Sequence, residues 1–298
     1  MSLAQAEDTV FFSQVTREAA SGMRKMSRIF YGCQTYTWKM NQERFAGDLP
    51  HIVSVAARAG YEGLESEICM LGDYFNDPLR AKAVFDDAGI SLAALVLHQD
   101  WKHMTETEDE RAMTEKALDF LSVFPKARLM VSHHAVPGDR SDDPEALALR
   151  RRQVISCMAS VANRAGEQGI VTAYHPNSSV NSLFRTHADY EVMFDMLSKT
   201  AVGWVPDIGH IVNGGMDALA MLKTGRDLIR HVHFKDRLGQ NEWAVMGEGR
   251  IDYPAVVSYL KETQYGGWIM VEDESPKAAE DSDAVVLADG AYMQRFRD

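Results

Sequence analysis

Short apolar runs alternate along the chain with longer segments in which apolar residues recur every three or four positions. Ile29–Gln34 is a β-branched and aromatic run, whereas Pro50–Ala59 carries apolar residues at helical spacing and stops at Gly60. Continuous or alternating apolar runs are typical of strands, and a period of about 3.6 residues is typical of amphipathic helices. A glycine after such a helix favours its termination. The pattern therefore predicts a strand followed by a helix.

The same alternation continues to the end of the chain. Eight strands are expected: Ile29–Gln34, Tyr61–Glu67, Ile90–His98, Ala127–Ser132, Ile170–Tyr174, Val202–Val205, Ile229–Phe234 and Trp268–Val271. Further helices are expected at Asp77–Ala88, at Glu106–Phe124, from Pro144 to about Gln168, and from Lys277 to about Phe296. Alternating strands and helices imply a parallel sheet, and eight such units can close into an α/β structure, the (β/α)8 or TIM barrel. A doubly wound open sheet is the alternative.

We expect a single domain over residues 28–298, because no Gly- or Pro-rich linker interrupts the alternation. Residues 1–27 are expected to form an N-terminal extension. They do not resemble a secretory signal, since the apolar run Val10–Phe12 is short and has acidic residues on both sides. No apolar run approaches the ~20 residues that a membrane-spanning helix requires.

Composition and charge narrow the classes of partner. The 298 residues are 46% hydrophobic and 25% charged, which suits an ordinary globular protein with a buried core. The net charge of −12 disfavours nucleic acid and anionic membranes as partners, because both bind clustered Lys and Arg. The cysteines, Cys33, Cys69 and Cys157, form no CxxC pair, and such a sparse, odd set indicates reduced thiols in a cytoplasmic protein.

Polar residues follow the last four expected strands. The segments are Tyr174–Asn177, Val205–His210, His231–Asp236 and Val271–Glu274. In a barrel the carboxyl ends of the strands meet at one face, which carries the active groups. Mixed nitrogen and oxygen ligands suit Mn²⁺, Co²⁺, Zn²⁺ or Fe²⁺, and the absence of cysteine disfavours a purely structural zinc site. One such His or Asp would be an ordinary core or turn residue, but a set on four successive strands favours a metal site.

Four segments, in this order and at these intervals, resemble the xylose-isomerase-like barrel superfamily of sugar isomerases, epimerases and related lyases. They are PDIGH (206–210), HVHFKD (231–236), MGEGRIDY (246–253) and GGWIMVEDE (266–274), and the resemblance covers the chain from about Ile29 onward. It implies one divalent metal ion, Mn²⁺ or Co²⁺ before Zn²⁺, Fe²⁺ or Mg²⁺. The ligands that it implies are His175, Asp207, His233 and Glu272.

The resemblance also implies roles beside the metal. His210, three residues after Asp207, would lie next to the substrate, and the basic residue after the seventh strand would be Lys235 or Arg237. Ketose epimerases of the superfamily have a Glu at the strand-five position, where this chain has His175. The HPN sequence at this strand is more similar to the inosose-dehydratase branch, although that branch leads us to expect a second His at Asn177.

The chemistry that these relatives share is removal of a proton α to a carbonyl. We therefore expect a metal-dependent enzyme that acts on a keto-sugar or keto-inositol, as a lyase of the dehydratase type or as a sugar isomerase or epimerase. Glu272 is the expected base, His210 the donor to the leaving oxygen, and His98 a second acid–base group.

Other candidates are assigned from their positions after strands. Trp38 and Trp101 are expected to form an apolar wall against a sugar ring, with core packing as the alternative. Either His133 or His134 is expected to contact substrate, and His134 is the preferred candidate. One of Glu65 and Glu67 is expected to face the barrel mouth, and the loop at 237–249 is expected to cover the site.

Rival functions have distinct requirements. A ketose isomerase or 3-epimerase would use the same metal, whereas a non-catalytic sugar-binding barrel would need no tight metal. An apurinic-site endonuclease would need more metal ligands and a basic surface, which the charge of −12 disfavours. The expected partner is a small keto-sugar or cyclitol, and a homo-oligomer or a small partner subunit is compatible with the sequence.

Overall fold

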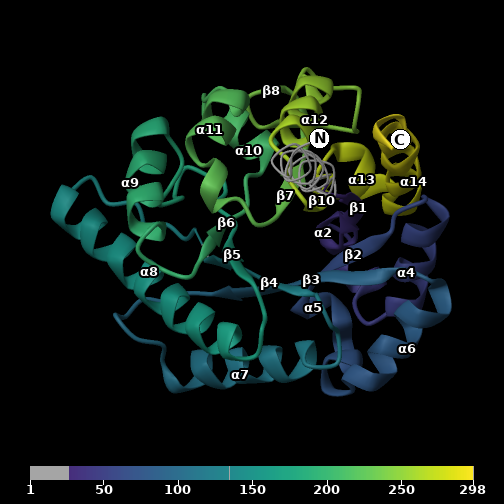
Figure 1. Ribbon diagram of the computed structural model, residues 1–298, viewed down its shortest axis with the longest axis horizontal. Coiled ribbons are helices and arrows are strands. Elements are labelled where there is room, and N and C mark those ends of the chain that lie inside the picture. The colour runs from purple at the N-terminus through teal and green to yellow at the C-terminus, as the bar shows by residue number, and fades with distance from the viewer. Residues whose placement is uncertain (1–26, 134, 298) are drawn as a thin grey trace, which may run out of the picture.

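The computed structural model describes residues 27–133 and 135–297 (Figure 1). Within them, eight parallel strands form one sheet in the order β6-β5-β4-β3-β2-β1-β10-β7. The strands are β1 (Ile29–Gln34), β2 (Gly63–Glu67), β3 (Ser91–Gln99), β4 (Arg128–His133), β5 (Thr172–Tyr174), β6 (Gly203–Trp204), β7 (Val232–Phe234) and β10 (Gly267–Val271). The eight strands expected from the sequence are confirmed, with ends that shift by a few residues. The proposed extension at residues 1–27 lies, apart from Ser27, outside the described residues.

The two end strands of this sheet, β6 and β7, meet and close it. Isolated parallel bridges join Trp204 to Ile229 and Asp207 to His233. The His233 N–H donates to the Pro206 carbonyl at 2.9 Å, and the Arg230 N–H donates to the Trp204 carbonyl at 3.0 Å. The fold is therefore a single-domain (β/α)8 TIM barrel, and the doubly wound alternative is excluded.

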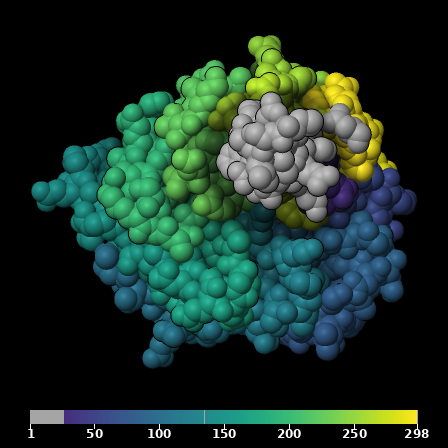
Figure 2. Space-filling model, viewed as in Figure 1, coloured from purple at the N-terminus to yellow at the C-terminus, as the bar shows by residue number. Residues whose placement is uncertain are grey.

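Helices cover the outer face of the barrel (Figure 1), and side chains fill the spaces that the ribbons leave between them (Figure 2). The longer ones are α4 (Leu49–Arg58), α6 (Pro78–Ala88), α7 (Glu108–Leu121), α8 (Pro144–Glu167), α9 (His187–Leu197), α12 (Tyr253–Glu262) and α14 (Ser282–Met293). Short helices are α2 (Tyr36–Lys39), α3 (Gln42–Phe45), α5 (Ile68–Leu71), α10 (Ile208–Asn213), α11 (Ala218–Thr224), α13 (Pro276–Glu280), η1 (Gly72–Asn76), η2 (Arg226–Leu228) and η3 (Gln294–Phe296). Every described helix is too short or too polar to serve as a membrane-spanning segment.

The last part of the chain corrects one prediction. The segment expected as a single helix from Lys277 to about Phe296 is divided into α13, α14 and η3. Asp281 leaves helical geometry at φ −147° and ψ 88°, and its side chain accepts the Ala284 N–H at 3.1 Å. An N-capping aspartate in mid-segment starts a new helix, so the prediction of one continuous helix is wrong.

The interior of the barrel is divided between apolar and charged side chains. Residues of β3, β4 and β5, with Val205 after β6, form a small buried apolar cluster: Ala94, Val96, Met130, Ala173 and Val205. On the side of β2 and β7, three buried titratable residues face one another: Glu65, His231 and His233. The main apolar core lies between the barrel and its helices.

Asp189 joins three outer segments of the barrel. It lies in the first turn of α9 and accepts the N–H groups of Arg185 at 3.1 Å and Thr186 at 2.9 Å. It also pairs with Arg140, in the loop before α8, at 2.8 Å and with Arg151 of α8. Burial alone would raise the pKa of Asp189, but Arg140 and the Thr186 donors lower it to about 2. The carboxylate therefore stabilises the folded state while it is ionised.

We predict that Asp189→Asn lowers the free energy of unfolding by about 2–4 kcal/mol at pH 7, because two guanidinium groups lose their anion. Since the folded-state pKa lies below the unfolded value, this loss should be complete above about pH 5 and should shrink as the pH falls toward 2. Urea unfolding of both proteins across that range measures it. Asp195→Asn, on the exposed face of α9 beside Lys199, is the control and should cost less than about 1 kcal/mol. Equal effects of the two changes would contradict the role of Asp189.

Candidate metal centre

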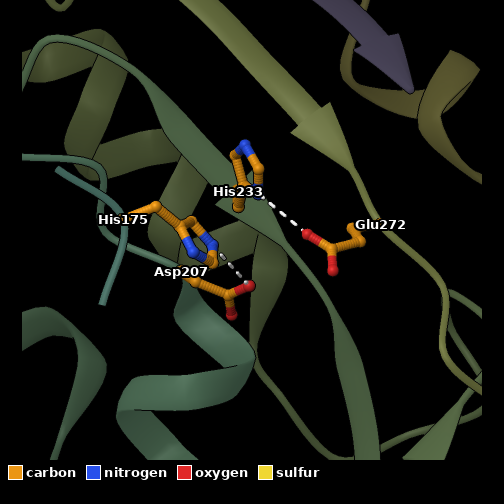
Figure 3. A group of neighbouring side chains, drawn as sticks. All are labelled: His175, Asp207, His233 and Glu272. Atoms are coloured by element: carbon orange, nitrogen blue, oxygen red, sulfur yellow. Dashed lines mark hydrogen bonds and ion pairs between the residues drawn. The ribbon is translucent and has the colours of Figure 1, made fainter. Parts of the chain in front are cut away.

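A pocket of about 500 Å³ opens where the strands of the barrel end. Its lining comes from segments that follow the carboxyl ends of nearly all the strands, with both carboxylates of β2, Glu65 and Glu67, among them. Four of the lining and flanking side chains point toward one another in Figure 3: His175, Asp207, His233 and Glu272. One nitrogen or oxygen atom from each lies within 4.8 Å of the others. The structure thus brings together the four residues that the resemblance implies as ligands.

Each of the four is placed by the end of a strand. His175 directly follows β5, Asp207 is the N-cap of α10, His233 lies in β7, and Glu272 directly follows β10. The bridge that closes the barrel sets Asp207 beside His233. His233 Nδ1 lies 3.1 Å from Glu272 Oε2, and His175 Nε2 lies 3.4 Å from Asp207 Oδ2.

Two atoms of this group are buried without a hydrogen-bond partner among the described residues. Asp207 Oδ1 accepts the His210 N–H at 2.8 Å as part of the helix cap, whereas Oδ2 has only longer ion-pair contacts, 3.4 Å to His175 Nε2 and 3.7 Å to Lys235 Nζ. His175 Nε2 is the second such atom. A buried polar atom without a partner costs about 1–3 kcal/mol, and a metal ion is a common reason for it. The oxygen and imidazole donors therefore fit a divalent cation.

Glu65 of β2 supports His233 on the side of its ring away from Glu272. Its carboxylate lies 3.0 Å from His233 Nε2 and 2.8 Å from His231 Nε2. Burial alone would raise the pKa of Glu65, but His233 and His231 lower it to about 2. Burial would lower the pKa of His233, but Glu65 and Glu272 raise it to about 10. The Glu65 carboxylate keeps a proton on His233 Nε2 and directs Nδ1 toward Glu272. Nδ1 is therefore the ring atom that would bind a metal ion.

Lys235 is the buried cation of the site. Its ammonium donates to Glu272 Oε1 at 2.8 Å, pairs with Glu274, and lies 3.2 Å from His210 Nε2. Burial would lower the pKa of Lys235, but Glu272, Glu274 and Asp207 raise it well above its usual value. Burial and the charge of Lys235 lower the pKa of His210 to about 3, so the imidazole is neutral. Lys235 rather than Arg237 therefore occupies the position next to His210.

The family model for the xylose isomerase-like TIM barrel matches residues 53–293. The chain belongs to this family. Inosose dehydratase of Lacticaseibacillus casei is 26% identical over 245 residues, which are 74% of this chain and 80% of the relative. The rhizopine catabolism protein MocC of Rhizobium meliloti is 24% identical over 286 residues, 85% of this chain and 84% of the relative.

Solved structures agree on the fold. The IolI protein, crystallised with a zinc atom, has a TM-score of 0.72 and 14% sequence identity, and the match covers 90% of this chain and 97% of IolI. At this level of identity the likeness shows the barrel fold alone.

Of the other histidine and arginine candidates within the described residues, only His98 lines the pocket. His98 lines the pocket and contacts the Ser132 hydroxyl, whereas His133 is buried with Nδ1 3.1 Å from the Tyr174 hydroxyl. His134, the residue expected to contact substrate, lies outside the described residues. Arg237 lies at a second surface pocket, where its Nε donates to the Gly239 carbonyl at 2.8 Å.

The expected tryptophan wall is not formed by Trp38 and Trp101. Both are fully buried in the core: Trp38 donates to Asp283 at 2.7 Å, and the backbone N–H of Trp101 donates to Glu110 at 2.7 Å. Neither residue is among those that line the pocket, so core packing, the alternative, describes both. The aromatic side chains of the described lining are instead Tyr36 and Trp243.

Trp243 comes from an element that the sequence indicated only as a covering loop. An antiparallel hairpin, β8 (Asp236–Gly239) and β9 (Glu242–Ala244), follows β7, and Asn241 and Trp243 line the pocket. The Trp243 ring meets the edge of the His210 ring at 5.3 Å between centroids. Ser178, Asn213 and Glu274 also line the pocket and had no signal in the sequence beyond their positions near strand ends.

We predict that Glu65→Gln weakens binding of Co²⁺ roughly 10- to 100-fold, because the outer carboxylate that orients His233 is lost. Titration of chelator-stripped protein with Co²⁺, followed by calorimetry, measures the affinity. Glu67→Gln is the matched control, since Glu67 lies on the same strand but pairs with Lys39 at 3.3 Å. Unchanged affinity in Glu65→Gln, or equal losses in both variants, would contradict the role of Glu65.

Proposed function

We propose that the protein is a metal-dependent carbohydrate lyase that removes a proton α to the carbonyl of a keto-inositol or keto-sugar and then eliminates water or another β-leaving group. The observation that carries this proposal is the position of Glu272, with one carboxylate oxygen toward the ligand group and the other toward Lys235. Membership of the family and the inosose dehydratase relatives support a sugar-modifying enzyme.

His175, Asp207, His233 and Glu272 are the proposed ligands, and Mn²⁺ or Co²⁺ is the first choice of ion, with Zn²⁺, Fe²⁺ and Mg²⁺ open. Zinc in the related IolI structure supports an ion of this class. When bound, the ion would act as a Lewis acid on the carbonyl oxygen and fix the orientation of the substrate.

Glu272 is the proposed base. Burial would raise its pKa, but Lys235 and His233 lower it well below its usual value, so it is a carboxylate at neutral pH. Its Oε1 accepts from the Lys235 ammonium at 2.8 Å and not from His233, and we propose that the second lone pair of this oxygen takes the proton from a substrate in the pocket. The same side chain can therefore serve as ligand and as base through different oxygens.

Lys235 and His210 are proposed to deliver a proton to the leaving oxygen. The sequence suggested His210 alone as the donor. The neutral imidazole lies 3.2 Å from the Lys235 ammonium. The lysine therefore carries the proton, and His210 accepts a hydrogen bond from the ammonium and orients it. His98, which also lines the pocket, is held as a second acid–base candidate.

The charge of the pocket favours an uncharged polyol. The described lining offers no unpaired basic group for a phosphate or carboxylate: Lys39 pairs with Glu67, and the nearby Lys235 pairs with Glu272 and Glu274. A charged substrate would have to compete with these pairs for a cation. Trp243 and Tyr36 supply apolar surface for one ring.

The rival functions have weaker support. Ketose 3-epimerisation would need carboxylates on two faces of the substrate, and the strand-five position holds His175. Nuclease activity would place a DNA backbone in this acid-rich pocket. A non-catalytic sugar-binding barrel would have no use for the buried Lys235–Glu272 pair.

We predict that Glu272→Gln lowers kcat by roughly 10²-fold or more, because the amide cannot accept the proton. The measurement is steady-state turnover of a keto-inositol or 3-keto-glycoside with saturating Mn²⁺. Glu248→Gln, an exposed change in a pair with Lys277, is the control and should keep wild-type turnover. Wild-type turnover in Glu272→Gln would assign the base to another residue, with His98 next.

Removal of the metal should stop proton abstraction and leave the fold intact. We expect deuterium uptake next to the carbonyl in D₂O to fall to background after chelation and to return with Mn²⁺ or Co²⁺. NMR of the product then separates the reactions, since a lyase gives an unsaturated or dehydrated product and an isomerase returns a labelled sugar. Full exchange in chelated protein would contradict the metal requirement.

A further inference from the structure

The tip of the β8–β9 hairpin is joined to the side chain of Asn213 by two hydrogen bonds. The backbone N–H of Asn241 donates to Asn213 Oδ1 at 2.8 Å, and Asn213 Nδ2 donates to Asn241 Oδ1 at 2.9 Å. The two bonds run in opposite directions, so they fix which end of the Asn213 amide is oxygen and which is nitrogen. Asn213 ends α10, the helix that Asp207 caps.

The same amide continues toward His210. Asn213 Nδ2 also donates to Ser178 Oγ at 2.8 Å, and Ser178 Oγ lies 2.9 Å from His210 Nδ1. Asn213, Ser178 and His210 are all buried. Two side chains of α10, Asn213 and His210, and the Ser178 side chain from the segment after β5 thus form one continuous line from the hairpin tip to the imidazole.

The other ring nitrogen fixes the direction of the proton. His210 Nε2 lies 3.2 Å from the Lys235 ammonium, which can only donate. Nε2 must therefore accept, and the ring proton lies on Nδ1, from which it is donated to Ser178 Oγ. The serine oxygen then accepts from both His210 and Asn213, which agrees with the amide orientation that the hairpin sets.

We propose that Asn241 and Asn213 are positioning residues that hold the ring orientation of His210 and protect its Nδ1 proton through Ser178 while the hairpin lies over the pocket. Trp243 of the same hairpin contacts the His210 ring, so one hairpin holds both the aromatic cover and this hydrogen-bond relay. The inference rests on the proposed function, in which His210 takes part in proton delivery.

Asn241→Gly is the most informative variant. Asn241 has φ 56°, a conformation that glycine adopts without strain, so the change removes the side chain and keeps the turn. In protein labelled with ¹⁵N-histidine and loaded with Zn²⁺, the ring ¹⁵N shifts report which nitrogen carries the proton, and exchange of the Nδ1 proton with solvent reports its protection. The His210 signals are assigned by their loss in His210→Gln.

Wild-type His210 should carry its proton on Nδ1. Exchange of that proton should be about three- to tenfold faster in Asn241→Gly, the change expected from loss of one hydrogen bond of ordinary net strength. Ser178→Ala should keep the proton on Nδ1, because Lys235 still donates to Nε2, but that proton should exchange faster than in Asn241→Gly since its acceptor is lost. Gln240→Ala, the exposed neighbour on the same turn, is the control and should match wild type.

A double-variant cycle tests whether the two asparagines act together. Asn213→Ala combined with Asn241→Gly should exchange no faster than Asn213→Ala alone, because both changes break one relay. Additive effects, or a wild-type exchange rate in Asn241→Gly, would overturn the proposal. Deuterium uptake by substrate is measured on the same wild-type sample. Its absence would count against the proposed function, whereas the exchange data decide the relay independently.

Discussion

The parallel bridge between Asp207 and His233 closes the barrel and sets the distance between two candidate metal ligands. β6 and β7 are short, so closure depends on a few contacts such as the His233 N–H to the Pro206 carbonyl. Because side chains alternate along a strand, a shift of one residue in this pairing would turn His233 away from the pocket. The architecture of the barrel and the geometry of the site are therefore fixed by the same hydrogen bonds.

The charged groups of the site stabilise one another more than they stabilise the fold. Lys235 and Glu272 are both buried, and their desolvation offsets much of their attraction. Glu65 in turn is shared between two imidazoles deep in the barrel. Such a network keeps each side chain in one orientation, which matters more for proton transfer than for stability. The extensive apolar core outside the barrel supplies the stability that this arrangement does not.

Sequence alone predicted the strands well, because most of them are short apolar runs between helical segments. It also placed His175, Asp207, His233 and Glu272 near one face, since strand ends in a barrel share a face. It could not show that Glu65 reaches His231, because that contact depends on the relative register of distant strands. Nor could it assign Trp38 and Trp101, because a large aromatic after a strand fits both a core and a pocket wall. The break at Asp281 was hidden because a helix-capping aspartate resembles an exposed one.

The division of the barrel interior has an evolutionary consequence. The ligand group and its supporting charges come from β2 and from the ends of β5, β6, β7 and β10. Val96 and Met130, from β3 and β4, give the pocket an apolar flank. Substitutions on this flank can reshape the space for a substrate without disturbing any charged contact. A lineage with this layout can thus diverge in the sugars it accepts while it inherits its reaction chemistry unchanged.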